Sequence, residues 1–78
     1  MDNNIFERLK AIAVNDIGID ADIVKPESDI VKDLKLDSFD IVDLLMSVEE
    51  EFGVVIDEGS VADIKTVADV VAFIENAK

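Results

Sequence analysis

Cysteine and histidine are both absent from this 78-residue sequence. Without cysteine, disulfides and thiolate metal sites are excluded, and nothing in the chain requires an oxidising compartment. Without histidine, the chain lacks the commonest general base and the commonest ligand of transition metals. These absences leave little for nucleophilic or metal-assisted catalysis, and we expect neither catalytic residues nor a metal site.

Long apolar runs are missing as well. No hydrophobic segment approaches the length of a membrane span, and the N-terminus lacks the basic-then-apolar pattern of a signal peptide. We therefore expect a soluble, cytoplasmic protein. Half of the residues are hydrophobic, which argues against disorder, and the length suits one small domain over residues 1–78.

Positive charge is scarce, with 7 basic residues against 19 acidic ones and a net charge of −12. Such a chain repels nucleic acid and anionic lipid and associates with basic surfaces. Every charged residue between Lys35 and Lys65 is acidic. These acids are Asp37, Asp40, Asp43, Glu49, Glu50, Glu51, Asp57, Glu58 and Asp63. The uneven distribution favours a binding face over the alternative that the acids only keep the protein in solution.

The abundant carboxylates do not form a calcium-binding motif. Asp20-Ala21-Asp22 begins like an EF-hand loop, but the glycine required at its sixth position and the glutamate at its twelfth are missing.

The N-terminal half predicts one helix followed by a long connection. Apolar residues recur at helical spacing up to Ile17, so we expect a helix from about Asn4, where Asn4 and Glu7 have capping-box spacing, to Gly18. Pro26 disfavours regular helix across residues 18–37, apart from one short turn near 28–31. Apolar anchors should pin this connection to the core, namely Ile19, Ile23, Val24, Ile30, Leu34 and Leu36.

The C-terminal part predicts a loop and two further helices. Residues 54–56 are β-branched but have no partner strand, so we expect a packed loop and then a short helix at 58–63. Thr66 and Asp69 have capping-box spacing and should start the last helix. Its inward stripe should be Val67, Val70, Val71 and Ile74, with Phe73 alongside. We therefore predict an all-α four-helix bundle with three longer helices, one short helix and a long first loop.

The segment from Leu36 to Gly53 is the most informative part of the chain. It predicts an amphipathic helix of about four turns that opens at Ser38, directly after Asp37, and ends at Gly53. Its core face should hold Ile41, Leu44, Leu45, Val48 and Phe52. Beside the core face runs a second apolar stripe, made of Phe39, Val42 and Met46. Next to this stripe, on the side away from the core, lies a polar row made of Asp43, Ser47 and Glu50. This arrangement suggests a docking surface that leads to an attachment point.

This segment resembles the modification site and second helix of the acyl carrier protein family. The resemblance is carried by Asp37-Ser38-Phe39-Asp40, Val42-Asp43-Leu44 and residues 46–52, and it extends along the whole chain, including Ile64-Lys65-Thr66-Val67. In that family the serine of an Asp-Ser-Leu motif receives a 4′-phosphopantetheine arm from coenzyme A, and the thiol of the arm carries acyl groups as thioesters. The resemblance implies that Ser38 is the attachment residue, with Asp37 before it. Phe39 replaces the motif leucine.

The alternative for Ser38 is a helix N-cap without further function, and Asp37 is open to the same interpretation. Both interpretations are physically compatible, because a helix N-terminus also favours an anionic phosphodiester. Ser38 is not expected to be a catalytic nucleophile, since no base at motif spacing could activate it. A separate phosphopantetheinyl transferase would have to supply the activation.

The resemblance also assigns two groups of residues around the helix. Basic partner enzymes would dock on Phe39, Asp40, Val42, Asp43, Met46, Ser47, Glu49 and Glu50. The acyl chain would enter an apolar gap between helices lined by Val48, Ile56, Ile64, Ala68 and Val71. The alternatives are a solvated acidic face, a core role for Val42, and ordinary core packing for the second group.

The resemblance therefore implies a carrier with no enzymatic activity, serving the separate enzymes of fatty acid biosynthesis. Its partners would be the transferase and synthesis enzymes with basic docking patches, with no nucleic acid or membrane span, and we expect a monomer. One alternative is a carrier of a specialised pathway for polyketide, peptide or D-alanyl transfer. Another is an acidic helical adaptor without a prosthetic group.

Overall fold

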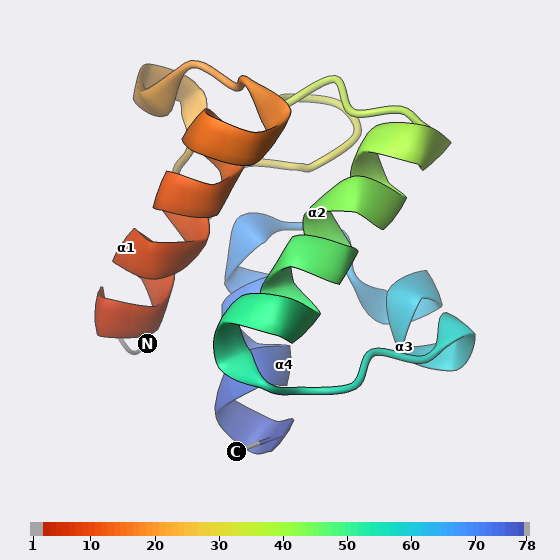
Figure 1. The fold of residues 1–78 in the computed structure, drawn as a ribbon. Coiled ribbons are helices and arrows are strands. Elements are labelled where there is room, and N and C mark those ends of the chain that lie inside the picture. Colours follow the sequence, from red (N-terminus) through yellow and green to blue (C-terminus); the bar gives the residue numbers. More distant parts are fainter. Residues whose placement is uncertain (1–2, 78) are drawn as a thin grey trace.

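The computed structural model describes residues 3–77, which form helices joined by loops (Figure 1). The α-helices are α1 (Asn3–Ile12), α2 (Ser38–Phe52), α3 (Glu58–Asp63) and α4 (Val67–Ala77). Within this range the only extended pairing is an isolated antiparallel bridge between Asp29 and Thr66. The prediction of a helical chain with a long first connection is confirmed, and α2 and α3 begin and end where the sequence pattern placed them.

The first helix changes type before it ends. It begins at Asn3, so Asn4 lies in its first turn, and after Ile12 the chain continues as the π-helical segment η1 (Ala13–Ile17). Gly18 then adopts a left-handed φ of +87°, and its N–H donates to the carbonyl of Ala13. A uniform helix up to Gly18 was therefore the wrong expectation, although its end is correct. The wider turn brings Ile19 back into the core, where it is buried.

The long connection contains a helical turn that the sequence did not indicate. This 3₁₀ turn, η2 (Ala21–Ile23), is capped by the carboxylate of Asp20, which accepts from Asp22 N at 2.9 Å. The expected turn near residues 28–31 lies slightly further along, where Asp33 N and Leu34 N both donate to Asp29 O. Ile23 is 41% exposed, so the prediction that it anchors the connection to the core is wrong. The other predicted anchors are buried: Ile19, Val24, Ile30, Leu34 and Leu36.

Loop carbonyls from this connection satisfy the first amide groups of α4. Val67 N donates to Ser28 O at 3.0 Å, and Ala68 N donates to Pro26 O at 2.8 Å. Ser28 is itself buried, and its hydroxyl accepts from Lys25 N and donates to the carbonyl of Ile23. The connection is thus held across the domain by backbone hydrogen bonds as well as by apolar side chains.

A reciprocal capping box starts α4, as predicted. Asp69 N donates to Thr66 Oγ1 at 3.2 Å, and Thr66 N donates to Asp69 Oδ2 at 3.0 Å. The same carboxylate accepts from Lys65 N, and these backbone donors lower the pKa of Asp69 below its ordinary value of 3.8. Backbone N–H groups of Lys32 and Val31 likewise lower the pKa of Asp29.

These two carboxylates predict how stability depends on pH. Since their folded-state pKa values are depressed, their contribution is present above pH 3.8 and is lost as pH falls below it. Between pH 7 and the isoelectric point near 4.1, acidification instead relieves repulsion among the excess acids. We expect the free energy of unfolding, measured with urea, to rise on mild acidification and then to fall below pH 3.8.

Asp69→Asn provides the control for this prediction. The amide oxygen can still accept the backbone hydrogen bonds but does not titrate, so the acid limb should become shallower. A wild-type stability that increases steadily down to pH 2.5 would contradict the role of the two carboxylates.

The core lies where α1, α2 and α4 pack together. Its most deeply buried side chains are Val48, Val70, Val71 and Ile74. On α2, the predicted core face is buried at Leu44, Leu45, Val48 and Phe52 and half-buried at Ile41. Among the helices of residues 3–77, none is both long and apolar enough to cross a membrane.

Candidate functional site

At the N-terminus of α2, the capping residue and the candidate attachment serine are two different residues. Asp37 is the N-cap: its Oδ1 accepts from Asp40 N at 2.9 Å, and its carbonyl accepts from Ile41 N at 3.0 Å. Ser38 is therefore the first residue of the helix. The alternative that Ser38 serves only as an N-cap is wrong, because Asp37 occupies that position.

The hydroxyl of Ser38 is accessible at this helix start. Ser38 is exposed, and within residues 3–77 its hydroxyl has no hydrogen-bond partner. The N–H groups of Ser38 and Phe39 also lack an acceptor in the described part of the chain. Such free amides at the positive end of a 15-residue helix suit a bound anion. The site therefore fits a phosphodiester on the serine, since no existing contact has to be broken to place it.

The chain that leads into Ser38 is held in place. Lys35 has a left-handed φ of +57°, which is uncommon for a residue other than glycine. The next residue, Leu36, is buried, and its N–H donates to the carbonyl of Ile30 at 3.1 Å. This turn anchors the approach to α2 on the core, so that the exposed serine is presented from a fixed backbone.

An exposed apolar stripe begins next to the serine. Phe39 is 82% exposed, Val42 54% and Met46 55%, whereas the adjacent core face of α2 is buried. The sequence-based division of this helix into a core face and a second, outward stripe is confirmed. The alternative of a core role for Val42 does not hold.

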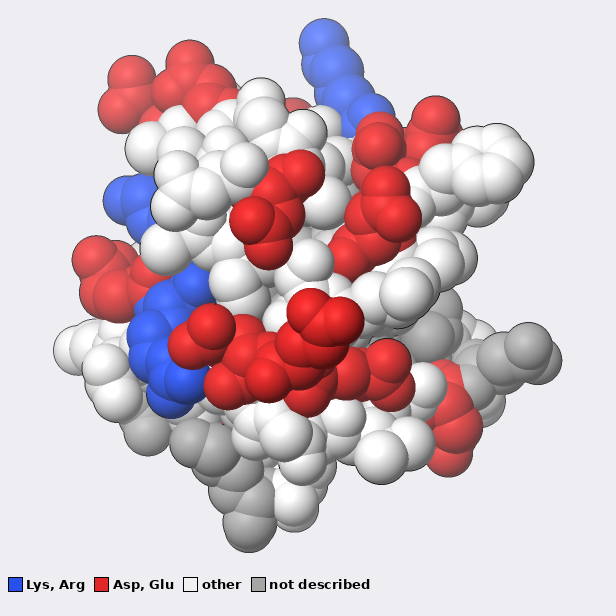
Figure 2. Space-filling model, in the orientation of Figure 1, with Lys and Arg blue, Asp and Glu red and all other residues white. Residues whose placement is uncertain are grey.

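Acidic side chains surround this stripe. Asp43 and Glu50 are exposed, while Asp40, Ser47 and Glu49 are half-buried. Figure 2 shows acidic side chains gathered over α2 with uncharged surface between them, and basic side chains at the top and left of this view, one of them against the acidic group. The predicted partner-binding residues thus lie along one helix, although they differ in exposure.

The three consecutive glutamates at the end of α2 have different surroundings. Glu49 accepts a hydrogen bond from Ile56 N, whereas Glu51 pairs with Arg8, 2.7 Å from Nη2 to Oε2. Arg8 also donates to the carbonyl of Glu51 and stacks over the ring of Phe52 at 4.4 Å. No signal in a run of identical residues distinguishes these roles, and sequence reasoning missed the contacts of both Arg8 and Glu49.

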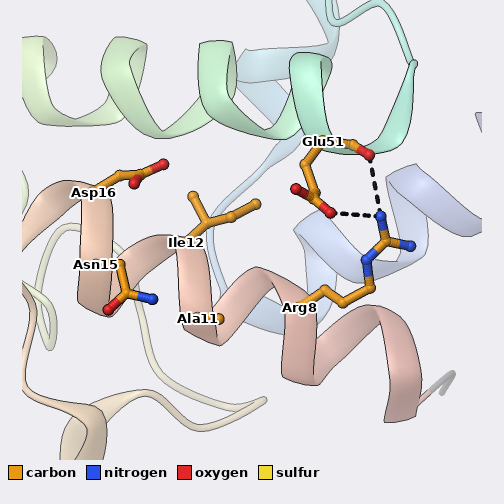
Figure 3. A pocket seen from close by; sticks show the side chains of 6 residues that line it. All are labelled: Arg8, Ala11, Ile12, Asn15, Asp16 and Glu51. Carbon is orange, nitrogen blue, oxygen red and sulfur yellow. Dashed lines mark hydrogen bonds and ion pairs between the residues drawn. The ribbon is translucent and has the colours of Figure 1, made fainter.

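The contact of Arg8 with Glu51 closes one end of a surface hollow between α1 and the end of α2 (Figure 3). The hollow has a volume of about 240 Å³ and is lined by Arg8, Ala11, Ile12, Asn15, Asp16 and Glu51. None of its lining residues was a predicted site residue. In the described part of the chain, no group of three or more carboxylates is arranged to hold a metal ion.

The five residues proposed for an acyl pocket lie in or against the core. Val48 and Val71 are fully buried, Ile56 and Ile64 are partly buried and pack on the core, and Ala68 is half-buried. Ile64 also lines a surface hollow of about 230 Å³ together with Asp63, Asp69, Ala72, Phe73 and Asn76. In this structure Val48 and Val71 are ordinary core residues.

A small helical domain that presents an accessible serine at the start of an acidic helix has the features of a carrier domain. Comparison with known proteins agrees. The family model described as the phosphopantetheine attachment site matches residues 7–74. The chain is 48% identical to an acyl carrier protein of Helicobacter hepaticus over 73 residues, which cover 94% of this chain and 96% of that protein.

The fold gives the same result. The crystal structure of an acyl carrier protein from Thermotoga maritima superposes with a TM-score of 0.84 at 28% sequence identity, covering 96% of this chain and 87% of that one. The chain belongs to the phosphopantetheine-attachment family of acyl carrier proteins. It is accordingly a carrier and not an enzyme, and its prosthetic group is 4′-phosphopantetheine.

Proposed function

We propose that Ser38 carries the 4′-phosphopantetheine arm and that the chain delivers acyl thioesters to the separate enzymes of fatty acid biosynthesis. The observation that carries this proposal is the exposed Ser38 hydroxyl at the first position of α2, with the capping role taken by Asp37. When attached, the arm supplies a thiol on a flexible tether. The protein's own contribution is to hold the hydroxyl at a fixed, positively polarised helix end where a transferase can reach it.

Asp37 has an indirect part in this proposal. Its carboxylate accepts the Asp40 N–H, so it defines where α2 begins and hence the position of Ser38. A transferase that recognises the Asp-Ser pair would therefore meet a preformed helix start rather than a flexible loop.

Docking of partner enzymes is proposed to use the exposed stripe and the acids beside it. Phe39, Val42 and Met46 offer apolar contact area, and Asp43 and Glu50 offer unburied negative charge. Asp40, Ser47 and Glu49 complete the face with half-buried polar groups. Because single exposed ion pairs contribute only about 0–1 kcal/mol, the acids should act together on encounter rate and orientation. Release of each partner then stays fast, as a shuttling carrier requires.

The function is tested by loading and elongation. A phosphopantetheinyl transferase with coenzyme A should add one phosphopantetheine to Ser38, seen by intact mass and located by peptide mapping. The loaded chain, offered to a reconstituted set of fatty acid synthesis enzymes, should then carry acyl groups that grow in two-carbon steps. Loading without elongation would instead support a specialised carrier for polyketide, peptide or D-alanyl transfer. The observation that favours a specialised carrier is that Phe39, at the position where the family has leucine, is 82% exposed.

We propose that a bound acyl chain enters the interior between Val48, Ile56, Ile64, Ala68 and Val71. The support is their position in or against the core, where each buried methylene contributes about 0.8 kcal/mol. The chain would have to separate side chains that now pack together, so that the gap opens only when it is filled.

Attachment of a medium-length acyl chain should therefore raise the melting temperature above that of the form with the bare arm. Calorimetry of the two forms measures the difference. Equal melting temperatures would argue that the acyl chain stays outside the core.

In its functional form we propose a monomeric four-helix bundle in the cytoplasm, with α1, α2 and α4 as the longer helices and α3 as the short one. The strong negative charge, −12 on 78 residues, supports a monomer, because like charge opposes self-association. Basic enzyme surfaces are its natural counterparts.

A further inference from the structure

The turn between α2 and α3 is held at both ends by one residue. The carbonyl of Glu49 accepts from Gly53 N at 2.9 Å, which is the helix cap, with Gly53 in a left-handed φ of +68°. The side chain of Glu49 accepts from Ile56 N, also at 2.9 Å, seven residues further along the chain. These two hydrogen bonds, the Glu49 bracket, therefore fix both ends of the segment from Gly53 to Ile56.

This bracket fixes which side chains of the turn face the core. Val54 is buried and Ile56 is half-buried against the core cluster, whereas Val55 between them is 82% exposed. The Ile56 amide is thus the point at which the edge of the core is fastened to α2. Without its acceptor, that amide would have to turn toward solvent, because a part-buried N–H that is left unpaired is unfavourable.

Glu49 also belongs to the acidic row along α2. Of the two glutamates that follow it, Glu51 is already paired with Arg8, and Glu50 is exposed. Glu49 is half-buried, so its carboxylate lies at the boundary between the docking face and the core. An arginine of a basic partner binds a carboxylate through both oxygens, and it would approach Glu49 from the docking face, whereas Ile56 N holds the same carboxylate from the side of the core.

From these contacts we propose that Glu49 is a positioning residue that couples partner docking to the turn between α2 and α3. A guanidinium that pairs with Glu49 from the docking face draws the carboxylate outward and so separates Oε2 from Ile56 N. The turn then loosens, and the core opens at Ile56, beside the interior proposed for the acyl chain. The inference rests on the proposed function for its docking partner, but the bracket is a property of the free chain.

Amide hydrogen exchange at Ile56 tests the bracket in the free protein. Glu49→Ala should speed exchange at Ile56 by about fivefold, the effect of losing one hydrogen bond. Glu49→Gln keeps an acceptor oxygen and should stay near the wild-type rate. Glu50→Ala is the matched control and should leave Ile56 unchanged. Gly53, whose acceptor is the main-chain carbonyl of Glu49, is the internal reference and should not change in any variant.

The coupling is tested by adding a phosphopantetheinyl transferase without coenzyme A, so that no covalent step occurs. Exchange at Ile56 should accelerate in the bound wild-type chain while Gly53 stays protected. In bound Glu49→Gln, which offers no charge to a guanidinium, Ile56 should keep its free-state rate.

Unchanged Ile56 exchange in Glu49→Ala would overturn the bracket. Unchanged or slower exchange in the bound wild-type chain would overturn the coupling alone. A chain that does not bind the transferase at all would overturn the coupling together with the proposed function, so the two failures are distinguishable.

Discussion

Substitution of Ser38 by alanine should abolish loading with phosphopantetheine completely. The arm is joined through the serine oxygen, and no neighbouring side chain at the start of α2 can replace it: Asp37 is held in the cap and Phe39 has no nucleophile. Intact mass spectrometry after incubation with a transferase and coenzyme A should show the full shift for the wild type and none for Ser38→Ala.

The fold should survive this change. Ser38 is exposed and donates no hydrogen bond within the described residues, and Asp37 still caps the helix. The melting temperature of Ser38→Ala should therefore lie close to that of the wild type, which separates lost loading from lost structure. Ser60→Ala, which removes a serine from α3, is the matched control and should load normally. A Ser38→Ala chain that still gains one phosphopantetheine would place the attachment elsewhere and contradict the proposed function.

Reversal of charge on α2 should slow association with a basic partner by about tenfold or more at low salt. The double variant Asp43→Lys with Glu50→Lys removes two exposed acids and adds two bases on the proposed docking face. Electrostatic steering depends on this local field, so the loss should appear mainly in the association rate. Stopped-flow or surface-plasmon measurements with the transferase, repeated from low to high salt, give both the rate and its salt dependence.

A control with the same change in net charge is available on another part of the molecule. Asp22→Lys with Glu27→Lys alters two exposed acids of the long connection, away from α2. If only net charge mattered, both double variants would slow association equally. A small effect of the control together with a large effect on α2 supports a localised docking face, whereas binding of the wild type that does not respond to salt would refute the electrostatic proposal.

Local sequence patterns were sufficient for the bounds of α2 and α3, for the start of α4 and for the surface of α2. The pairing of Thr66 with Asp69 located the start of α4, because a capping box is made by residues three apart and needs no tertiary partner. The two apolar stripes of α2 followed in the same way from helical periodicity. Asp37 and Ser38 were correctly placed at a helix start, but the pattern alone could not assign the cap, since either residue type performs that role.

The long connection and the end of the first helix show where local reasoning stopped. A π-helical turn before Gly18 and a 3₁₀ turn at residues 21–23 depend on how Ile19 and Val24 reach the core, which no local periodicity encodes. The prediction that Ile23 is buried failed for the same reason, because Ile19 and Val24 occupy the core positions that this part of the connection reaches.

The sequence by itself determined that this protein is acidic and helical and that its central helix starts at Asp37 and Ser38, because composition and periodicity are properties of neighbouring residues. The carrier function and the candidate attachment serine came from the resemblance of this segment to the acyl carrier protein family. Only the tertiary structure decided that Asp37 rather than Ser38 caps that helix. It also decided how three identical glutamates divide between an arginine, a backbone amide and the solvent. The pairing of Glu51 with Arg8 joins segments far apart in the chain, so packing of the whole chain decides it. The cap depends on the backbone path into α2, which is set where Leu36 is buried and its N–H donates to the carbonyl of Ile30.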